Sequence, residues 1–185
     1  MIRQTGIASA IVLAATALAQ SAPAPSGAAI DIPNSEIQAV AQRNAGAPVS
    51  DQQIRVISIN GDYNVGVGVV HRAKTEKQSV GGSEHSQITE VYHVISGNGT
   101  FVTGGTIENA KERPATNEAV RILTGPSMEG TRIIRGTSRK IGPGDVIVIP
   151  PNTPHTFTEI TSPEITYLVV RFDPHKVLPA GYSAK

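Results

Sequence analysis

The sequence predicts an all-β sandwich or barrel preceded by one short helix. Several short segments between residues 53 and 172 alternate apolar and polar side chains, which is the period-two pattern of a half-buried strand. Turn signals rich in glycine, proline and asparagine separate these segments, and only residues 34–44 carry a helical pattern. Many short strands with almost no helix are typical of a sandwich or a barrel.

Residues 1–19 have the pattern of a secretory signal peptide. Arg3 precedes an apolar, alanine-rich run over 7–18, and small residues surround the point where a signal peptidase would cut. The run is shorter than the roughly 20 residues that a membrane span needs. We therefore expect cleavage after Ala19, export to the periplasm or beyond the cell, and no membrane attachment of the mature protein.

Residues 20–49 are expected to form a lead-in segment and a short helix. The lead-in is rich in alanine, proline, serine and glycine, a composition typical of a flexible linker. Asn34 or Ser35 can cap a helix that runs to about Asn44, because Gly46 and Pro48 follow. The apolar face of this helix consists of Ile37, Val40 and Ala41.

The barrel is expected over 50–176, with a tail over 177–185. Its first strand begins near Gln53, and Asn60-Gly61-Asp62 is a strong hairpin-turn signal. In the following strand, over 63–72, three valines and His71 share one face, and two glycines share the other. Further strands are expected at 87–95, 99–103, 131–135, 146–149, 155–160 and 165–172.

A polar segment over about 104–130 interrupts this series of strands. It carries several charged side chains and few large apolar ones, so we expect an insertion without regular structure. Loops of this length in compact domains are usually functional or mobile. Both a lid over a site and a solvated flap remain open at this point.

Composition excludes several classes of chemistry. The chain has no cysteine, which excludes a disulfide framework, thiolate catalysis and cysteine-type zinc sites. Any bound metal must therefore be held by histidine, carboxylate or amide oxygen. Removal of residues 1–19 takes away Arg3 and leaves 15 basic and 15 acidic residues. This balance gives no electrostatic basis for a nucleic-acid partner or an anionic membrane surface.

Two histidine-bearing motifs, some sixty residues apart, are the most informative feature of the chain. In the first, His85 is followed after four residues by Glu90, and Gly97 follows after six more. In the second, a short apolar strand begins after a glycine turn, ends on prolines and leads to a histidine; its motif positions are Gly144, Pro150, Asn152 and His155. This pair of motifs resembles those of the cupin superfamily, and the resemblance covers 81–159.

Three positions depart from the cupin pattern. Ser83 stands where the family has the first histidine of a His-x-His pair, and Asn152 replaces a second glycine. Glu159 takes the last motif position, which is usually asparagine. The resemblance thus implies one metal ligand fewer than the family usually supplies.

The resemblance implies a double-stranded β-helix (jelly-roll) barrel with a metal site. The ligands that it implies are His85, Glu90 and His155, a set that suits Fe or Mn, with Zn or Ni as alternatives. Water, Gln87 or His71 can fill the place left by Ser83. A second register, in which His85 and Gln87 form the His-x-His pair, leaves only two residues before Glu90 and ranks below the first.

Tyr92 is the candidate catalytic residue. It lies two residues beyond Glu90, and strand alternation therefore places it on the same face as that ligand. Its phenol can act as an acid, a base or a hydrogen-bond donor to a substrate, or be a core tyrosine with a bonded hydroxyl. His93 points to the opposite face by the same alternation, and His175 lies in the tail, so neither is expected to bind metal.

Three functions remain open at the level of sequence. The first is an exported metal-dependent enzyme that acts on a small oxygenated molecule by dioxygenase-, decarboxylase-, lyase- or isomerase-type chemistry. The second is a non-catalytic module that binds a sugar or an acid. The third is a structural dimer with a vestigial site. We expect a small-molecule substrate and a homodimer; one fold hosts many activities, so the fold itself does not identify the substrate.

Overall fold

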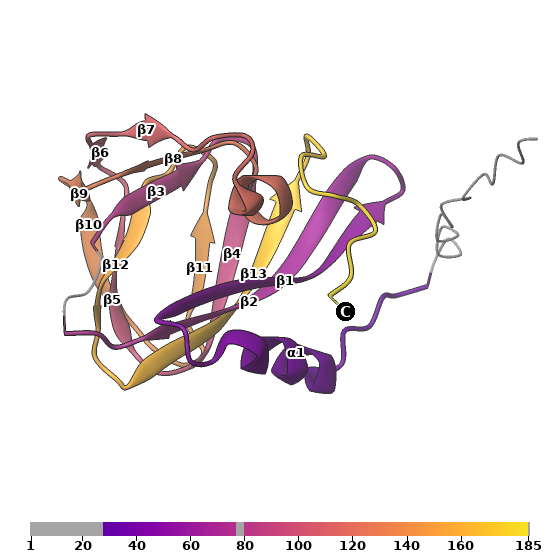
Figure 1. The fold of residues 1–185 in the computed structure, drawn as a ribbon, viewed down its shortest axis with the longest axis horizontal. Helices are drawn as coiled ribbons and strands as arrows, with labels where there is room; N and C mark the ends of the chain where they lie inside the picture. Colours follow the sequence, from indigo (N-terminus) through magenta and orange to yellow (C-terminus); the bar gives the residue numbers. More distant parts are fainter. Residues whose placement is uncertain (1–27, 77–79, 185) are drawn as a thin grey trace, which may run out of the picture.

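The computed structural model describes residues 28–76 and 80–184, and shows two antiparallel sheets that form the walls of a barrel (Figure 1). The prediction of an all-β jelly-roll barrel with a short N-terminal helix is confirmed. The predicted signal peptide lies outside the described residues. Within the part of the chain that is described, no helix is both long and apolar enough to cross a membrane.

The described residues form the following helical elements and strands. The helical elements are α1 (Asn34–Ala41), η1 (Gln42–Asn44) and η2 (Val120–Thr124). The strands are β1 (Val49–Ile59), β2 (Tyr63–Ala73), β3 (Gly82–His85), β4 (Thr89–Ser96), β5 (Gly99–Thr103), β6 (Thr106–Glu108), β7 (Lys111–Glu112), β8 (Ser127–Gly130), β9 (Arg132–Ile134), β10 (Thr137–Ile141), β11 (Val146–Ile149), β12 (His155–Ile160) and β13 (Glu164–Asp173).

Each of the two main sheets contains strands from both early and late parts of the chain. One sheet has the order β1-β2-β13-β4-β11, and the other has the order β10-β5-β12-β3-β8-β7. The predicted hairpin between β1 and β2 is confirmed: Ile59 pairs with Tyr63 across the turn. Asn60 and Gly61 both have positive φ values, of 50° and 75°, as an Asn-Gly hairpin turn requires.

The barrel is filled by an apolar core that continues into the wall of a cavity. The core residues are Val70, Tyr92, Val94, Phe101, Ile141, Ile147, Ile149, Phe157, Ile160, Ile165, Tyr167 and Val169. The aromatic rings pack on one another; the Tyr92 and Tyr167 centroids, for example, are 4.5 Å apart. Tyr92, Phe101 and Phe157 also line the cavity described below, so packed rings of the core form part of the cavity wall.

Helix α1 packs outside the barrel, beneath β1 and β2 (Figure 1). Val40 is buried against Ile54 and Val69. A bidentate ion pair between Arg55 of β1 and Glu36 also connects the helix to that strand. The predicted side-chain cap by Asn34 or Ser35 is wrong. The residue before the helix is Pro33, in an extended conformation, and no side chain caps the first turn.

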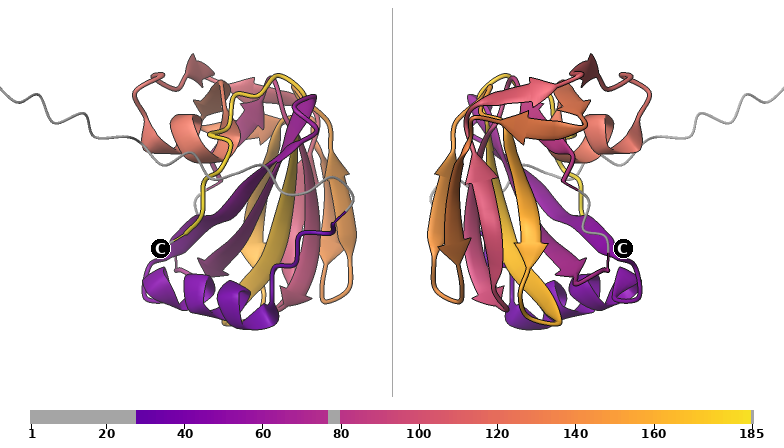
Figure 2. Two further views of the ribbon diagram at one scale, coloured as in Figure 1. Left: turned by 90° about the vertical axis from the view of Figure 1, so that its right-hand side faces the viewer. Right: turned by 90° about the vertical axis from the view of Figure 1, so that its left-hand side faces the viewer.

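The polar segment between β5 and β10 is more ordered than predicted. It contributes β8 and β7 to the edge of the second sheet, and it gathers at one end of the barrel (Figure 2). The predicted strand at 131–135 is β9, which pairs with β6 in a small separate sheet. This sheet packs so close to β3 that a Cβ at Gly82 would lie 2.6 Å from Ile133. Three apolar residues of the segment, Ile107, Val120 and Leu123, are buried and hold it in place.

Candidate metal centre

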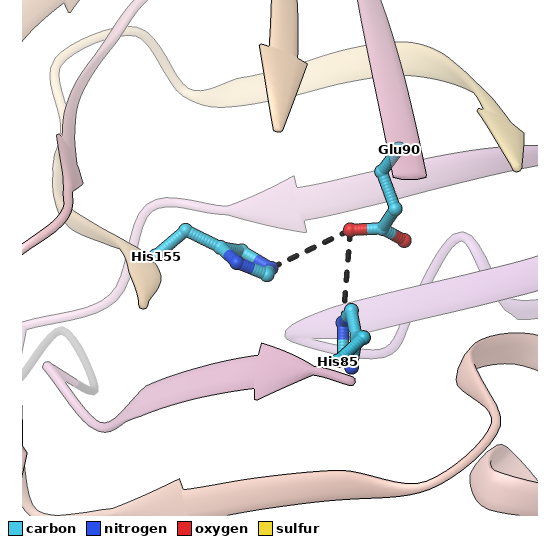
Figure 3. A group of neighbouring side chains, drawn as sticks. All are labelled: His85, Glu90 and His155. Atoms are coloured by element: carbon cyan, nitrogen blue, oxygen red, sulfur yellow. Dashed lines mark ion pairs between the residues drawn. The ribbon is translucent and has the colours of Figure 1, made fainter. Parts of the chain in front are cut away.

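Three side chains from three strands converge inside the barrel (Figure 3). His85 is the last residue of β3, Glu90 is the second residue of β4 and His155 is the first residue of β12. Glu90 Oε2 lies 3.6 Å from His85 Nε2 and 3.5 Å from His155 Nε2, and the three side chains are all buried. The ligand atoms of the group lie within 4.8 Å of one another, so one ion can contact all three.

The turn before β12 explains why the two motifs meet. The backbone N–H of Asn152 donates to the carbonyl of His85 over 2.8 Å, which joins the end of β3 to the start of β12. Asn152 has a φ of 58°, in the left-handed region where asparagine is among the best-tolerated side chains after glycine. Asparagine therefore serves at the position where the cupin pattern has glycine.

Both imidazoles are oriented by hydrogen bonds at Nδ1. His155 Nδ1 lies 2.9 Å from the carbonyl of Thr153, which can only accept, so Nδ1 carries the proton. His85 Nδ1 lies 2.8 Å from Ser127 Oγ, whose own hydroxyl donates to the carbonyl of Gly125 over 2.8 Å. In each ring the Nε2 lone pair is consequently free and directed at the centre of the group, which is the tautomer that a metal ligand needs.

The protonation states also match those of metal ligands. Burial lowers the pKa of His85 to about 3, and repulsion from His155 and Arg171 adds to this effect while Glu90 opposes it. Burial alone would raise the pKa of Glu90, but attraction from His85, Arg171 and His155 outweighs it and lowers the pKa to about 2. At neutral pH, His85 is a neutral imidazole and Glu90 is an ionised carboxylate.

Arg171 fixes the orientation of the Glu90 carboxylate. Its Nε donates to Glu90 Oε1 over 3.0 Å, which leaves Oε2 for the histidine side of the group. Its Nη atoms donate to Gln53 Oε1 and Asp51 Oδ2, at 3.0 and 2.6 Å. The guanidinium fits because Gly68 faces it: a Cβ there would lie 3.1 Å from Arg171 Nη1. A buried carboxylate and a buried guanidinium thus compensate each other.

Tyr92 lies on the same side as Glu90, as strand alternation predicted. Its hydroxyl donates to Glu90 Oε2 over 3.0 Å, and its ring lines the cavity. Burial raises the pKa of Tyr92 well above 10, and the charge of Glu90 adds to this effect. Of the roles that the sequence left open, the phenol is therefore suited to donating a hydrogen bond at neutral pH and not to acting as a base.

The residues proposed to complete the ligand set lie elsewhere. Gln87 does not share a strand face with His85, because β3 ends at His85 and Gln87 lies in the bend before β4. His71 lies outside the convergent group, and its Nδ1 is 3.5 Å from Glu164. His93 and His175 are exposed, as expected. Ser83 pairs with His155 across the sheet and lines the cavity, so the vacant ligand position faces the place where a substrate can enter.

His155, one of the three convergent residues, lines a cavity of about 580 Å³. Ser83 and Tyr92 line it beside His155, and Phe101 and Phe157 supply apolar wall. The polar part of the wall includes Arg72 and residues from 109–113 and 129–131. The insertion that was expected to be either a lid or a flap therefore forms part of the cavity wall. A cavity of this volume is of the size that holds a small molecule.

Two inward-facing arginines, the buried Arg171 and the half-buried Arg72, were missed by the sequence analysis. Arg171 alternates with Ile165, Tyr167 and Val169, so it lies on the buried face of an apolar strand. Arg72 follows Val70 on the glycine-containing face of β2 and lines the cavity. A lone arginine at an inward position of an apolar strand is the signal that would have found both, because buried charge requires a partner.

The donor set fits a divalent transition metal. Two imidazole nitrogens and one carboxylate oxygen on one side, with open positions opposite, suit Fe(II), Mn(II), Zn(II) or Ni(II). His85, Glu90 and His155 therefore form a group that could hold one divalent metal ion.

The comparisons with known proteins agree with the second motif. The model of the AraC-like ligand-binding domain, a cupin-type domain, matches residues 129–181, which include β11, the Asn152 turn and β12. No curated protein matches the sequence.

Similarity to solved structures is distant. The crystal structure of a Bacillus halodurans protein matches with 14% sequence identity and a TM-score of 0.46, and the match covers 85% of this chain and 89% of that one. A cupin protein from Bacteroides fragilis is 15% identical with a TM-score of 0.38, covering 64% of this chain and 72% of that one. Recombinant oxalate oxidase in complex with glycolate is 15% identical with a TM-score of 0.45, covering 69% of this chain and 52% of that one. The chain thus spans about half of the oxalate oxidase chain.

Proposed function

We propose that this chain, which is a member of the cupin superfamily, is an exported metal-dependent enzyme that acts on a small oxygenated molecule. The observation that carries the proposal is the convergence of His85, Glu90 and His155, the last of which lines a cavity of about 580 Å³. Fe or Mn is the proposed metal, with Zn or Ni as alternatives. Export is proposed from the pattern of residues 1–19.

Each residue of the site has a task that follows from its contacts. His85, Glu90 and His155 would hold the metal, which would supply Lewis-acid polarisation of a substrate oxygen or activation of dioxygen. Arg171 keeps the Glu90 carboxylate ionised and oriented. Tyr92 Oη holds a proton beside Glu90 Oε2 and can donate it in a hydrogen bond to charge that develops on the substrate. Phe101 and Phe157 exclude water from one wall.

The test is metal analysis of the mature protein followed by a turnover screen. We expect one Fe or Mn per chain in protein purified without chelators, and we expect the Glu90→Ala variant to lack it. The His93→Ala variant is the matched control, because His93 is exposed. Oxygen uptake and product formation are then measured over small acids, phenols and sugars. Failure of the wild type to retain any of Fe(II), Mn(II), Zn(II) or Ni(II) after reconstitution would contradict the proposal.

A second candidate function is a non-catalytic module that binds a sugar or an acid. The observation that favours it is the match of residues 129–181 to a domain described as ligand-binding. The turnover screen separates the two functions. A compound that binds in the cavity with no product formed by the metal-loaded protein favours the binding module.

A further inference from the structure

Arg72 places a positive charge inside the cavity. It lies on the inward face of β2, two residues after the core residue Val70, and it lines the same cavity as Tyr92 and His155. Its guanidinium carbon lies 5.2 Å from the centroid of the Phe157 ring, and its Nε donates to the hydroxyl of Tyr167 over 3.1 Å. The ring and the hydroxyl hold the guanidinium in one orientation.

Within residues 28–76 and 80–184, no carboxylate forms an ion pair with Arg72, although the charge of Asp51 attracts its guanidinium. None of the ion pairs in this part of the chain includes Arg72. Glu90 and Asp51, two acidic groups of the barrel interior, are both bonded to Arg171. Arg72 is half-buried, whereas Arg171 is fully buried. Arg72 therefore differs from Arg171 in having no anionic partner, among the described residues, for a charge that is partly removed from water.

The hydrogen-bonding capacity of Arg72 is also largely unused. A guanidinium has five N–H donors, and only the Nε–H of Arg72 has a side-chain or backbone acceptor among the described residues. Both Nη groups are thus free to bind an oxyanion. The fork that they form matches the two oxygens of a carboxylate, which arginine binds with two parallel hydrogen bonds.

The remaining charged residues of the cavity wall are more often positive than negative. Lys111 and Arg113 also line the cavity, and Glu129 is the one acidic residue among its lining residues. Arg113 and Glu129 compensate each other through an ion pair of 2.7 Å. Arg72 and Lys111 are left as uncompensated positive charges, so the field in the cavity favours an anion.

We propose that the substrate is a small carboxylic acid whose carboxylate is bound by the two Nη groups of Arg72. A second oxygen function of the same molecule then faces Ser83, Tyr92 and the His-Glu-His group across the cavity. This inference rests on the proposed function for the chemistry at the metal group. The binding of the acid itself depends on Arg72 and is separable from metal binding, because Arg72 is not one of the three ligands.

The experiment measures binding of matched acids and amides to the mature protein, both as purified and after removal of metal with chelator. The probes are succinate, malate and benzoate, each compared with its neutral amide, together with inorganic phosphate. Titration calorimetry at pH 7 gives the dissociation constants. Metal content is measured on the same samples.

We expect at least one acid to bind the wild type at least tenfold more tightly than its amide. The Arg72→Met and Arg72→Gln variants should lose this preference and keep their metal, whereas Arg72→Lys should keep part of it. Arg139→Gln is the matched control; it removes an exposed arginine on β10, outside the cavity.

The outcomes separate this inference from the proposed function. An acid preference that depends on Arg72, in a wild type that retains none of the four metals after reconstitution, supports the inference and contradicts the proposed enzyme. Equal binding of acids and amides, an undiminished preference in the folded Arg72 variants, no binding of any probe, or tighter binding of phosphate than of every acid would overturn the carboxylate assignment.

Discussion

Replacement of Arg171 by methionine tests the central electrostatic contact of the site. Arg171 and Glu90 are 1% and 2% exposed, and their Nε and Oε1 atoms are 3.0 Å apart. Methionine has a similar length and leaves the carboxylate buried without its cation. Because removal of one partner of a buried ion pair typically costs 3–5 kcal/mol, we expect the free energy of unfolding to fall by about that amount at pH 7.

The pH dependence of this loss gives a sharper test. In the wild type, Glu90 has its pKa lowered from 4.5 to about 2, so its contribution of about 3 kcal/mol is complete above pH 4.5 and is lost as the pH falls toward 2. His85 is neutral above about pH 3, so Arg171 is the cation that sustains the carboxylate at neutral pH. In the variant, burial raises the pKa of Glu90, and protonation relieves the cost. The difference between the unfolding free energies of the wild type and the Arg171→Met variant should therefore become smaller as the pH is lowered from 7 to 4.

The measurement is urea denaturation of metal-free protein, followed by far-ultraviolet circular dichroism because the chain has no tryptophan. Arg132→Met is the matched control. It removes an arginine whose ion pair with Glu108 is exposed, so the free energy of unfolding should hardly change. A loss for Arg171→Met that is the same at pH 7 and pH 4 would refute the electrostatic reasoning and leave only a packing role.

Three further predictions concern metal binding and the signal peptide. Alanine at any one of the three convergent ligands, His85, Glu90 or His155, should abolish metal binding, whereas His93→Ala should not; loss in His93→Ala alone would mean that the strand register is wrong by one residue. Ser83→His should tighten metal binding in chelator competition, because Ser83 faces the cavity beside His155; unchanged affinity would count against that orientation. Mass spectrometry of exported protein should find an N-terminus within a few residues of Gln20, and an intact Met1 would exclude cleavage.

The sequence was sufficient to predict the barrel where strands alternate or are rich in β-branched residues. β2 alternates valine with glycine, β11 and β13 are rich in valine and isoleucine, and Asn60-Gly61 marks the hairpin. β3 and β10 were not predicted, because their residues are mostly polar. β10 is an edge strand with one paired neighbour, and four of its five residues are exposed. Such strands are specified by pairing with the rest of the sheet and carry little local signal.

The spacing of the two motifs predicted which side chains meet, but not what surrounds them. Motif spacing is a local property. The resemblance to the cupin motifs implied His85, Glu90 and His155 as ligands, and these three residues lie together in the structure; that they bind a metal stays a prediction. The groups that orient them come from distant strands: Ser127 from β8 and Arg171 from β13. Their positions depend on which strands pair and in which register, and that information is not contained in the motifs.

The interior of this barrel contains charged side chains, and among the described residues they are not all paired. Well-packed apolar residues can replace a buried ion pair without loss of stability, so the Asp51–Arg171–Glu90 network is weak evidence for a stabilising role. Within that network each charge has a partner. Arg72 stands apart from it, with free donors and an anion-favouring cavity in front of it. The uncompensated group thus marks the place where a substrate carboxylate would complete the electrostatics of the site.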